Sequence, residues 1–257
     1  MGMLYGPTYS ADSRGPYMSR VSLSMCCLAI LFVGVRLYSR FALPGAPGLD
    51  DLFISIATQV FLIAQTSAIL MQIHSGWGEH AYELSLEQLN KSQMYRYQYI
   101  ILNFIVAFFT KLSICWLVLR MTAGATTFGR RYRSIIKLVM WFLLVRVITT
   151  VIVQSIPCWP VSTYWHLETR PHGCFDLLGW MITTSAIETS TDIVVLLIPL
   201  PLICIVQLGK SERMILFSLF VLGAIPAGFA FTRTVQLIQW RMDGGTPISD
   251  DFSWYIH

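Results

Sequence analysis

Six long runs of apolar residues dominate this chain, and each approaches or exceeds the roughly 20 residues that a helix needs to cross the hydrocarbon core of a bilayer. Only 12% of the 257 residues are charged, whereas roughly a quarter are charged in soluble domains. The runs lie at approximately Tyr17–Tyr38, Leu52–Ile73, Tyr97–Leu119, Ile135–Ile156, Leu177–Leu208 and Met214–Ile238. Because they occupy most of the chain, the sequence predicts an all-α polytopic membrane protein. Residues 17–257 form a single transmembrane helical bundle in this interpretation, and residues 1–16 form a short N-terminal segment.

The distribution of basic residues predicts how the chain crosses the membrane. The loop after the third run holds five basic residues and no acid, which is typical of a cytosolic loop (Arg120, Arg130, Arg131, Arg133 and Lys137). Alternation of the spans then leaves nine Lys/Arg and three acids on the cytosolic side, against six Lys/Arg and nine acids on the other. We therefore expect a multi-pass protein of the endoplasmic reticulum or plasma membrane whose N-terminus is lumenal or extracellular. The net charge of +4 follows from this topology and does not indicate a nucleic-acid partner.

The segments on the outside carry two candidate modification sites. Asn90-Lys91-Ser92 is an N-glycosylation sequon in a predicted outside loop, so we expect Asn90 to carry a glycan. Cys158 and Cys174 both fall between the fourth and fifth runs, where an oxidising compartment would permit a disulfide closing a loop of about fifteen residues. Two unlinked cysteines are the alternative. The five histidines show no zinc-ligand spacing, and no phosphate-binding, redox or nucleophile motif is present, so we expect no metal and no cofactor.

Five charged residues lie within the predicted spans: Lys111, Arg146, Glu188, Asp192 and Arg233. At the centre of a lone helix each would cost roughly 2.5–3.5 kcal/mol. We therefore expect four of them to face one another inside the bundle: Arg146, Glu188, Asp192 and Arg233. Lys111 either pairs with an acid or extends toward the interface. Glu188 and Asp192 are four residues apart and share one helix face, so we expect one carboxyl to stay protonated, Glu188 by preference. The charged member would be held by Arg146 or Arg233. Such residues either form an ion-pair network that fixes helix order or line a polar pocket for a small ligand.

Seven sequence features follow one another over nearly the whole chain. They are RLYSR (36–40), LDD (49–51), GWGEH (76–80), TKLSICWLVLR (110–120), CWPVSTYW (158–165), SAIETSTDIVVLLIPLPL (185–202) and an arginine in the sixth run, Arg233. This ordered set resembles the fungal rhodopsin-domain family of integral membrane proteins, which includes satratoxin-cluster membrane proteins and Pth-eleven-like receptors. The resemblance implies a rhodopsin-like helical bundle. The family usually has Asn where this chain has Glu188.

The resemblance also sets expectations for the seventh helix and for retinal. The family has seven spans and this chain shows six, so we expect the seventh helix to be missing, either in a true six-helix protein or through a shortened gene model. A retinal Schiff base needs a lysine, which in rhodopsins lies on the last helix. The only mid-span lysine here is Lys111, on the third run, so no retinal is expected.

The resemblance further implies a role in fungal secondary metabolism. We expect a bilayer protein that handles a hydrophobic small molecule or pathway intermediate in a polar pocket lined by the five intramembrane charges. A cyclase is one form of this role, with Glu188 and Asp192 as candidate catalytic residues. The alternatives are a Pth-eleven-like receptor or sensor for a small ligand and a non-catalytic accessory membrane protein. A receptor would signal through cytosolic loops and a tail, and the longest cytosolic loop, 121–134, is short and basic, which favours the pathway role.

Overall fold

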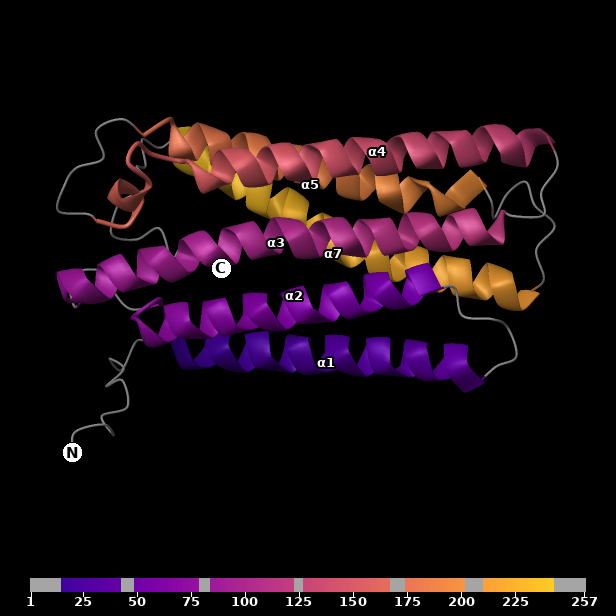
Figure 1. The fold of residues 1–257 in the computed structure, drawn as a ribbon, viewed down its shortest axis with the longest axis horizontal. Coiled ribbons are helices and arrows are strands. Elements are labelled where there is room, and N and C mark those ends of the chain that lie inside the picture. The colour runs from indigo at the N-terminus through magenta and orange to yellow at the C-terminus, as the bar shows by residue number, and fades with distance from the viewer. Residues whose placement is uncertain are drawn as a thin grey trace.

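The computed structural model describes residues 15–42, 49–78, 84–122, 127–166, 174–201 and 210–242. Within these ranges six long helices and one short 3-10 helix account for nearly all of the chain, and no strand occurs. The helices are α1 (Gly15–Ala42), α2 (Leu49–His74), α3 (Leu86–Met121), α4 (Thr127–Ser155), η2 (Val161–Tyr164), α5 (Leu177–Leu197) and α7 (Lys210–Met242). The long helices run along the long axis of an elongated bundle (Figure 1). The predicted all-α bundle is therefore confirmed, while residues 1–14 lie outside the described ranges.

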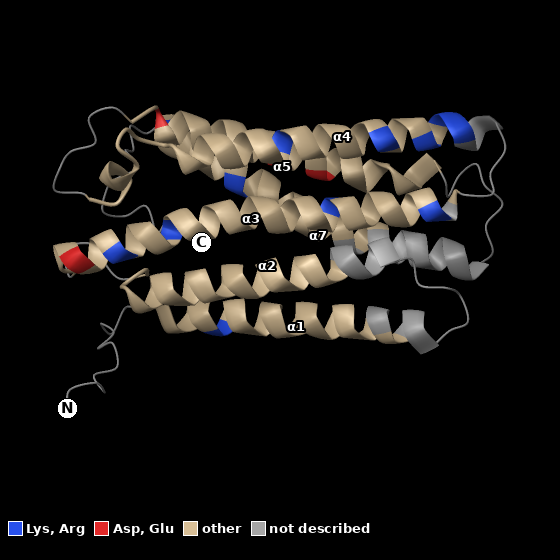
Figure 2. Ribbon diagram, in the orientation of Figure 1, with Lys and Arg blue, Asp and Glu red and all other residues tan. Residues whose placement is uncertain are grey.

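The surface of the bundle is suited to lipid. Five helices (α1 to α5) are long and apolar enough to cross a membrane within the described ranges. Large apolar side chains face outward along them; on α4, for example, Leu138 is 71% and Trp141 66% exposed. Charged residues lie mainly toward the helix ends, and few occur in the middle of the bundle (Figure 2). An exposed apolar surface of this extent requires a bilayer around it, so the protein is a multi-pass integral membrane protein.

Three of the predicted spans differ from the helices that contain them. The third span was expected from Tyr97, but α3 begins at Leu86, where Ser85 and Gln88 form a reciprocal capping box. The fifth was expected to reach Leu208; α5 ends at Leu197 and the apolar span continues to Pro201, while residues 202–208 lie outside the described ranges. The sixth falls on α7, which is helical through Pro226 but is not among the five described spans.

The bundle has two dissimilar ends. At one end, here called the core end, α3, α4 and α5 pack through fully or nearly fully buried apolar side chains (Cys115, Val118, Leu119, Ile136, Leu143, Val195 and Ile198). At the other end, here called the disulfide end, a smaller apolar cluster joins α5 to α7 (Leu178, Leu237 and Trp240). The two clusters leave the middle of α5 between them, and this is where its charged residues lie.

The disulfide end is fixed by a covalent bond and by polar contacts. Cys158 and Cys174 form the predicted disulfide, which confirms that expectation. On the adjoining helices, the Tyr97 hydroxyl donates to the carbonyl oxygen of Ser155 over 2.9 Å and so ties α3 to α4. Beyond α2, Gly76 and Gly78 have φ values of +100° and +97°, so the sharp turn at these glycines needs residues without a Cβ. The chain can therefore reverse direction just outside the membrane.

Candidate functional site

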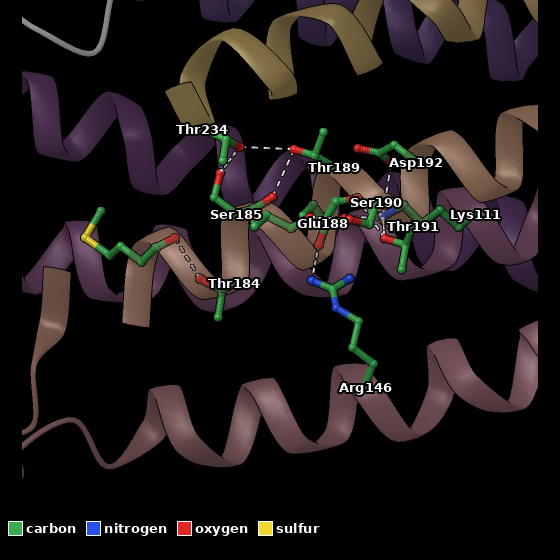
Figure 3. A network of polar contacts seen from close by, with 12 residues as sticks. Lys111, Arg146, Thr184, Ser185, Glu188, Thr189, Ser190, Thr191, Asp192 and Thr234 are labelled. Atoms are coloured by element: carbon green, nitrogen blue, oxygen red, sulfur yellow. Dashed lines mark hydrogen bonds and ion pairs between the residues drawn. The ribbon is translucent and has the colours of Figure 1, made fainter. Parts of the chain in front are cut away.

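The middle of the bundle holds a buried cluster of four charged side chains. Lys111 of α3 donates its Nζ hydrogens to Glu188 Oε1 and to Asp192 Oδ1, the latter over 3.0 Å. Arg146 of α4 donates to the second oxygen, Oε2, of Glu188. Glu188 thus bridges α3 and α4, and its carboxylate has a cation on each oxygen (Figure 3). The side chains of Lys111, Arg146 and Glu188 are 5%, 10% and 16% exposed, so water does not screen these contacts.

Hydroxyl groups of α5 complete the surroundings of this cluster. Lys111 Nζ also donates to Thr191 Oγ1 over 2.8 Å, so the ammonium group has partners for its three hydrogens. One turn away, Thr234 Oγ1 of α7 lies 2.8 Å from Ser185 Oγ and 3.1 Å from Thr189 Oγ1, which joins α7 to α5. These contacts join α3, α4, α5 and α7 through the ionic cluster and the hydroxyl groups beside it, which together are here called the polar layer.

Two adjoining cavities lie between this layer and the disulfide end. The smaller, about 90 Å³, has Glu188 in its wall together with Asn103, Gln154, Thr184 and Ser185. The larger, about 150 Å³, is lined by Gln72, Trp77 and Arg96. Both cavities share Tyr99, Ile100, Met181 and Arg233 in their walls, so we treat them as one space and call it the chamber. The chamber is lined by residues of α2, α3, α4, α5 and α7, and its wall mixes apolar surface with hydrogen-bonding groups, which is typical of a small-molecule site.

The family comparison agrees with this architecture. The family described as the fungal rhodopsin domain matches residues 35–256, which is most of the chain. The chain belongs to the fungal rhodopsin domain family. Neither the curated proteins nor the solved structures gave a match to it. The membership fits the helical bundle and its membrane-compatible surface.

Of the five intramembrane charges predicted for this fungal rhodopsin domain, the structure brings four together. Lys111, Arg146, Glu188 and Asp192 meet in one cluster, and Lys111 pairs with acids instead of extending to the interface. Arg146 is the arginine that holds Glu188. Arg233 lies apart from the cluster, in the wall of the chamber. The five residues therefore divide into a closed ionic cluster and one separate arginine.

The sequon was expected in a loop, and this detail is wrong. Asn90 lies within α3, in its second turn, and the hydroxyl-bearing Ser92 is only 6% exposed. The reason is the capping box at Ser85, which starts α3 several residues before the predicted apolar span. The sequon therefore becomes part of the helix. Whether Asn90 carries a glycan stays a prediction.

Several wall residues of the chamber were not predicted. On α3 they are Arg96, Tyr99 and Asn103, whose spacing of three and four residues places them on one helix face. Continuing that face by two turns reaches Lys111. On α5 the corresponding row is Thr184 and Glu188. The signal for both rows in the sequence is polar residues repeating every three or four positions. Apolar runs, which define the spans, do not reveal it.

Proposed function

We propose that this fungal rhodopsin domain binds a lipophilic small molecule in the chamber and that the ligand contacts the polar layer at Glu188. The observation that carries the proposal is that Glu188 belongs both to the chamber wall and to the ionic cluster joining α3, α4 and α5. A ligand that donates a hydrogen bond to Glu188 would compete with Lys111 or Arg146. Binding would thus change how three helices are held together, which is how a ligand biases a bundle between two arrangements.

The surroundings of Glu188 favour binding over acid catalysis at this residue. A general acid must hold a proton within reach of the reacting atom. Each oxygen of Glu188 instead accepts a hydrogen bond from a cation, Lys111 on one side and Arg146 on the other. Asp192 has one cation partner among the described residues and its side chain is 27% exposed, so it is the carboxyl that a substrate reaches more easily. The sequence favoured Glu188 as the protonated member, and which carboxyl holds a proton stays a prediction.

The binding proposal can be tested by filling the chamber. Ala230 of α7 lies in its wall, and Ala230→Phe would occupy the space. Ala224→Phe introduces the same side chain into the same helix at an exposed position outside the wall, and it serves as the control. We expect a lipophilic metabolite fraction to raise the melting temperature of the wild type and of Ala224→Phe, reconstituted in lipid nanodiscs, but not that of Ala230→Phe. Equal shifts in all three proteins would reject the chamber as the binding site.

A cyclase acting in a secondary-metabolite pathway is the second candidate, and the exposure of Asp192 favours it. Glu188→Gln and Asp192→Asn variants that accumulate in membranes would separate the two roles. A catalytic role predicts loss of one metabolite and accumulation of its linear precursor in Asp192→Asn. If both variants keep full production, the carboxylates do not catalyse a pathway step.

We further propose that the N-terminus and the disulfide end face the lumen or the exterior. The excess of basic residues at the opposite end, including Arg130, Arg131 and Arg133, supports this orientation. Glycosylation mapping tests it: the native sequon at Asn90, or a sequon placed in the adjoining turn after Trp77, should be modified. A sequon modified only when it is moved into the 121–134 segment would reverse the topology.

A further inference from the structure

The wall of the chamber carries positive charge that the ionic cluster does not balance. The cluster itself is neutral, because Lys111 and Arg146 face Glu188 and Asp192. The larger cavity adds the guanidinium group of Arg233, and its described wall residues include no carboxylate. Arg96 lies in the same wall, with its guanidinium over the Trp77 ring at 5.4 Å. Arg233 makes no hydrogen bond or ion pair with any residue in the described ranges. A guanidinium without an anion is costly at membrane depth, so this wall is suited to an anion.

Arg233 lies deep along the length of the bundle, well away from its disulfide end. Eight residues separate it from Arg241, whose ion pair with Asp176 at 2.9 Å marks the end of α5 and α7. At 1.5 Å per residue, this places Arg233 about 12 Å below that pair. Its neighbour Thr234 contacts Ser185, within one turn of Glu188 on α5. Arg233 therefore does not lie at the membrane–water interface, and its charge is part of the chamber wall.

A second, independent feature of the same cavity lacks a partner. Gln72 of α2 is 2% exposed, and its Nε2 donor has no hydrogen-bond partner among the described residues. A buried amide donor left unpaired costs about 1–3 kcal/mol. Gln72 lines the larger cavity with both arginines. An acceptor in this cavity would satisfy the amide and the Arg233 guanidinium at once.

The shape and remaining surface of the cavity restrict the ligand further. A volume of about 150 Å³ is below the roughly 300 Å³ of a site that encloses a drug-sized molecule, so it holds a head group rather than a whole ligand. Ile69, Ile100 and Met181 supply apolar wall around the polar groups. Arg233 is exposed in the bundle surface, so a tail can leave the cavity toward lipid. These features fit a compact anionic head on an apolar body.

We propose that the chamber recognises the oxyanion head, a carboxylate or phosphate, of an amphipathic molecule whose tail lies in the bilayer. Guanidinium groups bind such heads through two parallel hydrogen bonds, and Arg233 supplies them here. Gln72 donates the additional hydrogen bond. The inference rests on the proposed function, since it names the ligand class for the same chamber.

The test uses tritiated dodecanoate and its neutral methyl ester with the full-length protein in phosphatidylcholine nanodiscs. We expect saturable binding of dodecanoate and at least about tenfold weaker binding of the ester, the loss that corresponds to one charge-assisted hydrogen bond. Arg233→Gln should lose about tenfold in dodecanoate affinity, and Arg233→Lys should retain part of it, because lysine keeps the charge but not the paired donors. Gln72→Leu should weaken binding with similar side-chain volume. Arg241→Gln is the control and should bind as the wild type does, because Arg241 pairs with Asp176 outside the chamber.

Two further arms identify the source of the oxyanion and separate this inference from the proposed function. If phosphatidic acid in the nanodisc displaces dodecanoate from the wild type, and more weakly from Arg233→Gln, a phospholipid head is the occupant; if it does not, the site takes a free acid. Equal affinity for acid and ester, both abolished by Ala230→Phe, would overturn the oxyanion proposal and leave the proposed function intact. Absence of saturable dodecanoate binding, or binding unchanged by Arg233→Gln and Gln72→Leu, would also overturn it.

Discussion

The two halves of the bundle are built from the same helices in different ways. At the core end, α3, α4 and α5 meet through apolar side chains with almost no exposed surface, such as Cys115, Ile136 and Leu143. At the disulfide end the same three helices, with α2 and α7, surround the chamber. The ionic cluster at Glu188 lies between the two regions. The core end therefore holds the helices together by tight apolar packing, while the disulfide end encloses the chamber.

The largest loss of stability is expected from removing Lys111, the cation that pairs with both acids of the ionic cluster. Lys111→Met leaves Asp192 without a cation partner among the described residues and removes one of two from Glu188. Breaking a buried ion pair in this way costs about 3–5 kcal/mol, which unfolding of the detergent-solubilised protein would measure. Adding Asp192→Asn should recover part of the loss. The control Lys91→Met should melt as the wild type does, because Lys91 pairs with Glu87 on the surface. If Lys111→Met were as stable as the wild type, the ion pairs of the cluster would not contribute to holding the helices together.

The next effect tests the core end directly. Leu143 is 2% exposed within the apolar cluster, so Leu143→Ala should lower the free energy of unfolding by about 2–5 kcal/mol. Leu138→Ala on the same helix removes the same atoms from a side chain facing lipid, and its loss should be much smaller. Similar losses in both variants would mean that the core end is no better packed than the lipid-facing surface.

A smaller effect is expected where α7 meets α5 beside the chamber. Thr234→Val removes the hydroxyl that contacts Ser185 and Thr189, and interhelical hydrogen bonds in membranes contribute about 0.6 kcal/mol on average. Thr232→Val is the matched control, since the Thr232 hydroxyl donates only to the carbonyl oxygen of Gly228 in its own helix. The difference between the two melting temperatures measures how firmly the chamber wall is held. If Thr234→Val lost as much stability as Leu143→Ala, the disulfide end would be held as tightly as the core end, contrary to the comparison above.

The smallest effect concerns the outer end of α5. The backbone amide of Gly179 and the guanidinium of Arg241 donate to Asp176 and hold the pKa of its carboxyl below the ordinary value of 3.8. Because the folded pKa is lowered, this stabilisation is complete above the ordinary pKa and is lost as the pH falls through the lowered one. The melting temperatures of the wild type and Asp176→Asn should therefore differ most near neutral pH and converge in acid. A difference that persists at acid pH would exclude this contribution.

The sequence predicted the helices and the members of the ionic cluster better than the chamber. Apolar runs define spans because a bilayer demands them. The cost of lone charges predicted that Arg146, Glu188 and Asp192 would face inward, while Lys111 could equally have extended to the membrane surface. Which cation reaches which acid depends on helix rotation, so the pairing of Glu188 with both Lys111 and Arg146 could not be derived from sequence spacing. Arg96 was counted as an outside residue because the apolar run began after it. Gln72 gave no signal, since a single amide in an apolar run is not distinguishable from a lipid-facing one until the neighbouring helix is placed.

The position of the cluster along the chain has a consequence for how the protein enters the membrane. Ribosomes make Lys111 and Arg146 before Glu188 and Asp192, so the cations reach the bilayer first. Their spans, α3 and α4, are more apolar than that of α5, so each can tolerate one lone charge during insertion. The α5 span carries two carboxylates and six hydroxyl side chains in a less apolar segment. It becomes a favourable membrane helix when α3 and α4 are already in place to receive its acids, so the order of the charges along the chain makes the early helices a template for the later one.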